Sequence, residues 1–306
     1  MIGEALVDVV SKRGQEPRAH AGGSPMNVAV GLARLGHRVQ FLGRYGEDEY
    51  GAQVEAHLRD NGVLLPFEAD ARPTSVAEAV IGADGAATYD FQLDWSLDLG
   101  DERLGELLRD TTLLHVGSIG AMLEPGASKV RHAVELAQHT ALVSYDPNCR
   151  PSIIPDSSRA RARAEQLVAL ADVVKASDED LLWLYPHRGV EESAAAWLRA
   201  GAELVVVTRG PLGPWALTRA TGPRGVQVPA ARAEVVDTVG AGDSFMAALL
   251  AWLTDHGFTG AAARERLDDL DAEQVGELLR YAASAAGVTV SRAGADLPRA
   301  DELPSS

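Results

Sequence analysis

The sequence contains almost no cysteine, and this excludes several kinds of site. Cys149 is the single cysteine among 306 residues, so the chain can form neither an internal disulfide nor a metal site built from several cysteines. A lone cysteine of this kind more often fills a partly buried apolar position than acts as a nucleophile. The eight histidines show no HExxH pair or similar ligand spacing, which argues against a zinc enzyme. These features favour a reducing compartment, and we expect a cytoplasmic protein.

Long apolar runs and positive charge are also scarce. No apolar run is long enough to span a bilayer, and the apolar N-terminus shows neither a basic leader nor a small-residue cleavage pattern. The 28 Lys and Arg residues are outnumbered by 44 Asp and Glu residues, which gives a net charge of −16. Such a charge argues against non-specific binding to nucleic acid or to an anionic membrane. Any bound phosphate must therefore be held by a local arrangement of groups.

Two familiar phosphate-binding motifs are missing. A P-loop needs Gly-Lys followed by Ser or Thr, but none of the three lysines, Lys12, Lys129 and Lys175, follows a glycine. A dinucleotide-binding fingerprint would follow the first strand as G-x-G-x-x-G and open a helix. This chain instead has Gly-Gly-Ser-Pro at residues 22–25, after a polar stretch. A P-loop enzyme is excluded and a dehydrogenase is disfavoured.

Residues 237–245, with the sequence DTVGAGDSF, are the strongest candidate for an anion site. The small residues 240–242 leave backbone N–H groups accessible, and the apolar segment that follows predicts a helix ending near Gly257. Asp243 falls in the first turn of this helix, beside the place where a polyphosphate would bind. This combination favours phosphoryl transfer, which needs positioning, charge stabilisation and one group to orient or deprotonate the nucleophile. The structural alternative is an ordinary glycine turn before a buried helix.

Short apolar stretches alternate with stretches of helical periodicity along most of the chain. Strands are expected near residues 1–10, 39–43, 113–116, 141–145, 172–175 and 204–207. This alternation predicts an α/β fold with a largely parallel sheet covered by helices on both faces. Ligands bind such sheets at the carboxyl ends of the strands. Polar or glycine-containing clusters occur at those ends, at Asp8 and at residues 117–118, 146–150, 175–177 and 208–210.

Residues 70–95 have a different pattern. Two β-rich stretches, 75–81 and 88–93, flank a turn at residues 84–85, which predicts a hairpin with no helix. An insertion of this kind in an alternating chain is best interpreted as a lid. We expect the lid to comprise approximately residues 9–20 and 70–97, and its hairpin offers a surface for a homodimer.

A helix is expected to begin directly after Gly22 and Gly23. Ser24 suits the N-cap and Pro25 the first helical position. Asn27 then lies in the opening turn. Taken alone, this pattern is equally consistent with a tight glycine loop followed by an N-terminal polar residue.

Two long signatures resemble those of the ribokinase/PfkB carbohydrate kinases. Residues 21–29 (AGGSPMNVA), with Gly36 and Gly46 at their spacings, resemble the N-terminal signature, and residues 237–250 resemble the C-terminal one. Further stretches that look like family landmarks are residues 43–51, 208–213 and 291–295. The resemblance covers nearly the whole chain and implies one kinase domain over residues 1–306. It implies a ribokinase-like three-layer α/β/α sandwich with a mostly parallel central sheet and a small β-lid.

The resemblance also implies an ATP-dependent sugar kinase and a role for each matching residue. Asp243 would take the proton from the attacking hydroxyl, and Gly240, Ala241 and Gly242 would form the anion hole. Positions that hold sugar hydroxyls in the family are matched by Asp8, Gly22, Gly23 and Asn27. A nucleotide-binding loop is matched by Thr208, Gly210 and Gly213. Mg²⁺ should accompany ATP and bridge its phosphates.

Two further matches concern metal ions. Asp237 matches a residue linked in the family to a monovalent cation such as K⁺, with backbone carbonyls near Val239, Thr289 and Gly294 as companions. The family's Asn-x-x-Glu motif appears here as the variant Ser-Asp-Glu-Asp at residues 177–180. Ser177 would then lie at the nucleotide and Asp180 in the magnesium region, although the shorter carboxylate departs from the family pattern. A plain helix N-cap at Ser177 is the alternative.

The substrate is indicated by residues 146–151, because DPNCRP resembles the DPNxRP run of fructokinase-like and 2-keto-3-deoxygluconate-kinase-like members. Arg150 would reach the substrate; alternatively, it pairs with Asp146 or a nearby carboxylate. A keto-deoxy acid kinase should carry a lid arginine after paired tyrosines, but residues 88–94 (TYDFQLD) have no arginine and two acids. This favours a neutral hexose, with fructose first.

Two alternatives to a fructokinase stay open. One is a kinase for 2-keto-3-deoxygluconate or for another sugar or nucleoside of the ribokinase family. The other is a non-catalytic sugar-binding relative, which is disfavoured because Asp243 and the Gly-Ala-Gly loop are intact. In each case the expected partners are small molecules.

Overall fold

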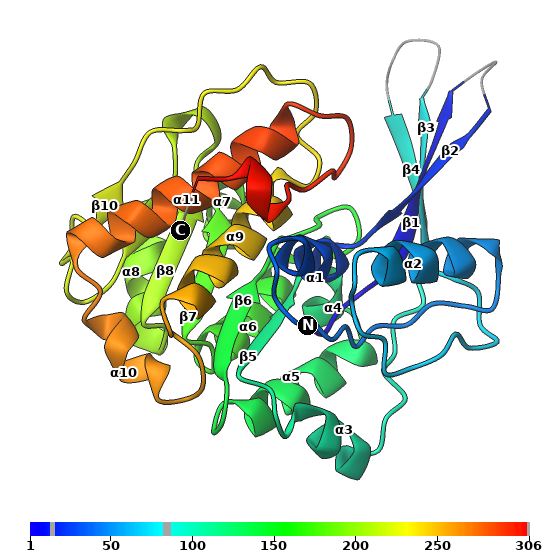
Figure 1. The fold of residues 1–306 in the computed structure, drawn as a ribbon, viewed down its shortest axis with the longest axis horizontal. Helices are drawn as coiled ribbons and strands as arrows, with labels where there is room; N and C mark the ends of the chain where they lie inside the picture. The colour runs from blue at the N-terminus through cyan, green and yellow to red at the C-terminus, as the bar shows by residue number, and fades with distance from the viewer. Residues whose placement is uncertain (13–15, 82–86, 305–306) are drawn as a thin grey trace.

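A six-stranded sheet in the order β10-β9-β8-β7-β6-β5 lies at the centre of the molecule (Figure 1). The computed structural model describes residues 1–12, 16–81 and 87–304. The strands of this sheet are β5 (Leu113–Gly117), β6 (Leu142–Asp146), β7 (Val173–Ser177), β8 (Leu204–Thr208), β9 (Trp215–Leu217) and β10 (Val226–Gln227). Strands β5 to β8 are parallel, whereas β9 and β10 pair antiparallel. The predicted, mostly parallel central sheet is confirmed.

Helices cover both faces of this sheet. They are α1 (Ser24–Arg34), α2 (Glu49–Asp60), α3 (Asp101–Leu108), α4 (Ser118–Met122), α5 (Gly126–Ala137), α6 (Ser157–Val168), α7 (Asp178–Leu184), α8 (Val190–Ala200), α9 (Ala241–Asp255), α10 (Ala263–Asp268) and α11 (Ala272–Val290). Successive strand residues point to opposite faces. Leu204 and Val206 join the core to which α1, α9, α10 and α11 contribute, and Val205 and Val207 join the core to which α3 and α5 to α8 contribute. Helix α2 packs against residues 6–12 and 18–22. The predicted three-layer α/β/α arrangement is therefore confirmed.

A second, four-stranded sheet projects to one side of the large sheet (Figure 1). Its strands are β1 (Leu6–Lys12), β2 (Arg18–Gly22), β3 (Val76–Ile81) and β4 (Ala87–Gln92), in the order β2-β1-β3-β4. Strand β1 pairs antiparallel with β2 and parallel with β3, and β3 pairs antiparallel with β4. The predicted turn at residues 84–85 lies outside the described residues. We call these four strands the small sheet.

The first predicted strand is wrong in its extent. We expected one strand over residues 1–10, but the structure divides this stretch between the two sheets. Ile2 bridges Leu42 and Val116 beside the large sheet, whereas residues 6–12 belong to the small sheet. The sequence hides the break because residues on both sides of it are apolar and buried. The second expected strand, 39–43, is likewise reduced to isolated bridges at Gln40 and Leu42.

Helix α9 lies deep inside one helical layer. All residues from 243 to 253 are buried, and α11 packs along it in the same core. A helix that is buried on every side is held firmly in position, so the groups at its N-terminus are held firmly as well. In the described part of the chain, neither this helix nor any other is long and apolar enough to cross a membrane.

Candidate active site

The N-terminus of α9 provides the anion site expected at residues 240–242. Gly240 is the N-cap residue and has a φ of 77°, in the left-handed region. A Cβ at Gly240 would lie only 2.6 Å from the Cβ of Ala295, so both conformation and space require glycine. Ala241 and Gly242 then begin the helix, whose first turn presents N–H groups and the positive end of the helix dipole. Anions bind readily at such a position.

Asp243 lies in this first turn and is held by two side chains of α1. The hydroxyl of Ser24 donates to Asp243 Oδ1 at 2.6 Å, and Asn27 Nδ2 donates to Asp243 Oδ2 at 2.8 Å. Asn148, which follows β6, donates to Ser24 Oγ at 2.8 Å. The carboxylate is 6% exposed. The structure thus brings Asp243 and Asn27 together and adds Ser24 and Asn148, to which the sequence assigned no such contact.

The predicted capping role of Ser24 is wrong. Helix α1 begins at Ser24 itself, with Gly23 as the N-cap residue and no side-chain capping bond. Gly23 has a φ of 113°, and a Cβ there would lie 2.5 Å from the carbonyl oxygen of Glu4. The chain therefore enters the helix through a glycine, and the Ser24 hydroxyl is available for Asp243. The Ser-Pro pair concealed this, because it is typical of an N-cap and first helical position.

A buried ion pair lies beside the helix N-terminus. Lys175 Nζ is 2.6 Å from Asp146 Oδ2, and the two side chains are 4% and 0% exposed. The same ammonium group would be 3.3 Å from a Cβ placed on Gly242. A positive charge thus lies next to the Gly240–Gly242 loop. Lys175 follows no glycine and so matches no P-loop, but a lysine on an otherwise apolar strand is a signal that could have identified it.

The charges of this pair are maintained by its surroundings. Burial disfavours the charged form of Lys175, but the neighbouring carboxylates, Asp146 first, outweigh it and raise the pKa of Lys175. Burial raises the pKa of Asp146 to about 6, with Lys175 acting against this shift. Lys175 therefore stays protonated at neutral pH, and its ammonium group lies beside the Gly240–Gly242 loop, where it can interact with a polyphosphate.

Glu4 is a second buried carboxyl group that the sequence did not single out. It is 4% exposed, and its Oε2 accepts the N–H of Gly120 at 2.7 Å. Burial is the main cause that raises the pKa of Glu4 to about 7, and hydrogen bonds from Gly120 and Ser118 oppose it. Glu4 lies where the chain passes from the large sheet to β1.

In the small sheet the side chain of Asp8 lies against the backbone of Gly22. Asp8 pairs with His20 across β1 and β2, and a Cβ on Gly22 would lie 2.2 Å from Asp8 Oδ2. Any side chain at position 22 would therefore displace the Asp8 carboxylate. Asp8 is exposed, and both Arg150 and Asp243 act on it electrostatically. The predicted sugar-binding residues therefore share one region. The side chain of Tyr89, on the neighbouring hairpin, lies outside the described residues.

Arg150 is exposed and does not pair with Asp146. Its Nη1 donates to the backbone oxygens of Asn148 and Cys149 at 3.0 and 3.1 Å, and to Asn148 Oδ1 at 2.5 Å. The alternative of a pair with Asp146 is wrong because the buried Lys175 occupies that carboxylate. The charge of Arg150 acts on the carboxyl groups of Glu4 and Asp8.

Ser177 and Asp180 form a helix cap. Ser177 is the N-cap residue of α7, and its N–H and hydroxyl both donate to Asp180 Oδ2, at 2.9 and 2.7 Å. The other oxygen, Oδ1, accepts the N–H of Cys149 at 2.7 Å. Both carboxylate oxygens are therefore engaged within the protein. This geometry matches the alternative interpretation, a plain helix N-cap at Ser177. Among the described residues, no group of three His, Cys, Asp or Glu side chains could hold a metal ion.

The predicted nucleotide loop follows β8. Thr208 pairs with Ser177 across β7 and β8, so the two residues lie side by side at the carboxyl edge of the sheet. Gly210 has a φ of 47° and Gly213 a φ of 82°, and a Cβ on Gly213 would lie 2.1 Å from Val228 O. Both glycines are thus required by the backbone. The loop lies at the sheet edge where ligands bind.

Asp237 ties the loop before α9 to the segment after α11. Its two oxygens accept the N–H groups of Val239 at 3.0 Å and Gly294 at 2.8 Å, and these hydrogen bonds lower the pKa of Asp237. The hydroxyl of Thr289 is engaged within its own helix, where it donates to Ala285 O. The carbonyls of Thr289 and Gly294 accept N–H groups from Arg292 and Asp296. Thr289 O also accepts the N–H of Ser291.

Comparison with known proteins identifies the family. The profile of the pfkB family carbohydrate kinases matches residues 2–302. A probable fructokinase-4 of Arabidopsis thaliana is 33% identical over 99% of this chain and 94% of its own length. A fructokinase of Rhizobium leguminosarum bv. trifolii is 35% identical over 82% of this chain and 78% of its own.

Solved structures agree with this match. The fructokinase from Xylella fastidiosa with bound ATP has a TM-score of 0.82 and 29% identity, and the match covers 99% of this chain and 94% of that chain. The fructokinase from Vibrio cholerae O395 bound to fructose, ADP and calcium has a TM-score of 0.76 and 28% identity, over 96% and 93% of the two chains. The fold is therefore that of these kinases, and the resemblance drawn from the two sequence signatures is confirmed. Because the family profile and these relatives match along almost its whole length, the chain belongs to the pfkB family of carbohydrate kinases.

Proposed function

We propose that this protein is a fructokinase, which transfers the γ-phosphate of ATP to a hydroxyl group of fructose. The observation that carries the proposal is the position of Asp243. Its carboxylate is oriented by Ser24 and Asn27 and lies in the first turn of a helix beside the Lys175 cation. Fructokinases among the relatives and structural neighbours support fructose as the sugar.

Asp243 acts as the general base. It accepts the proton of the attacking hydroxyl, whose oxygen forms a bond to the γ-phosphorus while the bond to the bridging oxygen of ADP breaks. A positioned base contributes about 10²–10⁴-fold to such a rate. The amides of Gly240, Ala241 and Gly242 and the ammonium group of Lys175 stabilise the charge on the transferring phosphoryl group. Lys175 is an addition to the residues that the sequence proposed.

The sugar is held between the two sheets. Asp8 accepts hydrogen bonds from sugar hydroxyls, and Gly22 and Gly23 let the sugar approach the backbone. Asn27 orients the general base Asp243 through its hydrogen bond. Arg150 lies at the mouth of the site. We propose that the small sheet acts as a lid over the sugar, that residues 1–306 form one kinase domain, and that the hairpin of the small sheet is a dimer surface.

The nucleotide extends from α9 towards β7 and β8. Ser177, Thr208, Gly210 and Gly213 border ATP in this proposal. Mg²⁺ would enter the site with ATP, and Asp180 would not be its main ligand, since both oxygens of Asp180 already accept protein hydrogen bonds. When bound, Mg²⁺ neutralises phosphate charge. A monovalent cation such as K⁺ would bind at Asp237 and at backbone carbonyls near Val239, Thr289 and Gly294. We place the reaction in the cytoplasm.

A coupled assay of ADP release tests the proposal. The purified protein is given ATP, Mg²⁺ and, separately, fructose, ribose, a nucleoside and 2-keto-3-deoxygluconate, with K⁺ and with Na⁺. We expect the largest kcat/KM with fructose. Turnover with a different sugar would replace fructose by that substrate, and binding of sugar without turnover would make the protein a non-catalytic relative.

A further inference from the structure

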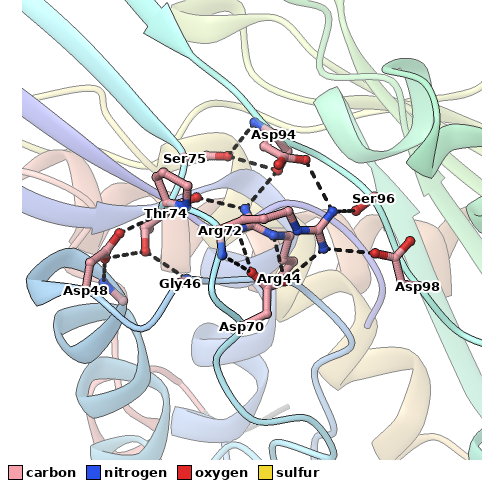
Figure 2. A network of polar contacts seen from close by, with 12 residues as sticks. Arg44, Gly46, Asp48, Asp70, Arg72, Thr74, Ser75, Asp94, Ser96 and Asp98 are labelled. Atoms are coloured by element: carbon pink, nitrogen blue, oxygen red, sulfur yellow. Dashed lines mark hydrogen bonds and ion pairs between the residues drawn. The ribbon is translucent and has the colours of Figure 1, made fainter.

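A network of charged and polar groups lies at the base of the small sheet, outside the site described above (Figure 2). Arg44 is at its centre and is 7% exposed. Its guanidinium group binds Asp70 through two hydrogen bonds, Nε to Oδ2 at 2.9 Å and Nη2 to Oδ1 at 2.8 Å. Its Nη1 donates to two backbone carbonyls, Pro73 O at 2.9 Å and Asp94 O at 3.3 Å.

These two carbonyls belong to the two ends of one hairpin. Pro73 precedes β3 and Asp94 follows β4. Ser75 links the same ends, because its hydroxyl lies 3.2 Å from Asp94 O and accepts the N–H of Asp94 at 3.1 Å. Arg44 is separated by one residue from Leu42, which bridges Ile2 beside the large sheet. One buried side chain thus fastens both hairpin ends to the body of the protein.

A second set of hydrogen bonds, between Asp48 and Thr74, lies next to those of Arg44. Asp48 caps α2 by accepting the N–H of Gly51, and it also accepts the N–H and the hydroxyl of Thr74 at 2.8 and 2.6 Å. Thr74 Oγ1 in turn accepts the N–H of Gly46 at 2.9 Å. The segment entering β3 is therefore held at Pro73 by Arg44 and at Thr74 by Asp48.

Strand pairing connects the start of β3 to β1, the strand that carries Asp8. Val7 N donates to Ser75 O at 2.9 Å, and Asp8 lies opposite Ala77 in the parallel pairing of β1 with β3. The backbone of Asp8 is therefore tied to the start of β3. Because hydrogen-bonded strands move together, a shift of the hairpin ends would move Asp8 relative to Asn27 and Asp243.

We propose that Arg44 is a positioning residue for the sugar substrate. By binding the carbonyls of Pro73 and Asp94, it holds the small sheet in the position in which Asp8 can contact the sugar. This inference rests on the proposed function, in which Asp8 binds sugar hydroxyls. The pairing with Asp70 is permanent at neutral pH. Burial would raise the pKa of Asp70, but hydrogen bonds from Arg44 and Arg72 outweigh it and hold this pKa far below its usual range.

Arginine is required here for its shape. A planar guanidinium group can bind a carboxylate with two parallel hydrogen bonds while a third N–H group reaches the carbonyls. A lysine keeps the charge but has one nitrogen, so Arg44→Lys would leave a carbonyl or a carboxylate oxygen without its donor. Buried polar groups that lose their partner favour rearrangement, and the hairpin ends are the parts that can move.

Arg72 offers a matched control. It binds the same Asp70 and also reaches Ser96 Oγ and Asp98, but its side chain is 38% exposed and donates to neither hairpin carbonyl. The test compares Arg44→Lys with Arg72→Lys, and both with the wild type. The measurements are KM for the sugar, KM for ATP, kcat, and hydrogen exchange of β1, β3 and β4 without ligand.

For Arg44→Lys we expect KM for the sugar to rise about tenfold or more. KM for ATP and kcat should stay within about threefold, and amides of the small sheet should exchange faster than in the wild type while β5 to β8 are unchanged. Arg72→Lys should change KM for the sugar less than twofold. Asp70→Asn, which weakens the same pairing from the other side, should shift KM and exchange in the same direction as Arg44→Lys.

Three outcomes would count against these assignments. An unchanged KM for the sugar in Arg44→Lys would overturn the positioning role and leave the proposed function intact. Equal increases in both KM values, or equal effects of the two lysine variants, would show a general loss of structure and also overturn it. A wild type that phosphorylates no sugar would overturn the proposed function itself.

Discussion

Asn27 Nδ2 lies 2.8 Å from Asp243 Oδ2, although the two residues are 216 positions apart in the sequence. The contact joins the opening turns of α1 and α9. Each of these turns lies in one of the two signatures found in the sequence. The signatures are therefore the two halves of one site, in which the first orients the carboxylate that the second supplies.

Replacing Asp243 with Asn should lower kcat at least about a hundredfold, because an amide cannot accept the proton of the sugar hydroxyl. Sugar affinity and the melting temperature should change little, since the amide can still interact with Ser24 and Asn27. Steady-state kinetics and thermal unfolding measure the two effects. Asp255→Asn, at the other end of the same helix, is the control and should behave like the wild type. Near-normal turnover of Asp243→Asn would assign the base to another group.

The Lys175 prediction separates a catalytic role from a structural one. Lys175→Met should lower kcat about a hundredfold through loss of charge at the phosphate. It should also destabilise the protein by about 3–5 kcal/mol, because the buried Asp146 loses its partner.

The double variant Lys175→Met/Asp146→Asn removes the unpaired charge. It should recover much of the stability in urea denaturation while turnover stays low. Recovery of wild-type turnover in the double variant would mean that Lys175 serves only to neutralise Asp146.

The sequence predicted the layers but not the points where the chain changes sheets. The alternation of short apolar strands with helices was sufficient for the α/β/α arrangement, because each face of a covered parallel sheet must be apolar. The passage from Ile2 to Leu6 was not visible, since a buried apolar run looks the same in either sheet. Helix α10 is not among the elements that the sequence predicted, because only Ala263 and Leu267 are buried along it and give it little apolar periodicity.

The sequence predicted those site residues whose role depends on local sequence spacing. Gly240 and Gly242 could be identified because their spacing is typical of an anion loop, and Asp243 because it follows them. Lys175 and Asn148 could not, because their roles depend on which strand ends are neighbours in space. Such contacts are set by the packing of distant segments rather than by local pattern.

Glu4 should make stability depend on pH. Its pKa rises from an ordinary 4.5 to about 7 in the folded protein, chiefly through burial. The folded state thus binds this proton more tightly than the unfolded chain, so the stabilisation is complete below about pH 4.5 and is lost as the pH rises through 7. Relative to the wild type, Glu4→Gln should gain about 3 kcal/mol of unfolding free energy between pH 4.5 and 8.

Urea denaturation across this pH range measures the difference. Asp146 and Glu203 also have raised pKa values, but they are present in both proteins and cancel in the comparison. Glu277→Gln, at an exposed position of α11, is the control and should leave the pH profile unchanged. Parallel profiles for Glu4→Gln and the wild type would show that Glu4 does not titrate in this range.

The last prediction concerns the choice between a neutral and an acidic sugar. A carboxylated sugar brings a negative charge into a protein of net charge −16, and a desolvated carboxylate is costly without paired donors. Two buried cations already pair with carboxylates: Lys175, beside the proposed phosphate site, with Asp146, and Arg44, at the base of the small sheet, with Asp70. Arg150 is exposed, and its charge acts on the Asp8 carboxyl group.

Strand β4 and the residues after it supply no compensating charge. Asp90 is exposed on β4, and Asp94 lies within 3.8 Å of Arg72, which is shared with two further carboxylates. Hydroxyl groups need no such compensation, because Asp8 can accept their hydrogen bonds. We therefore expect kcat/KM for D-fructose to exceed that for 2-keto-3-deoxygluconate at least about tenfold, equivalent to roughly 1.4 kcal/mol. Both sugars are assayed side by side at saturating ATP, and equal or reversed preference would mean that Arg150 alone suffices for the carboxylate and that the acid-sugar kinase is the better assignment.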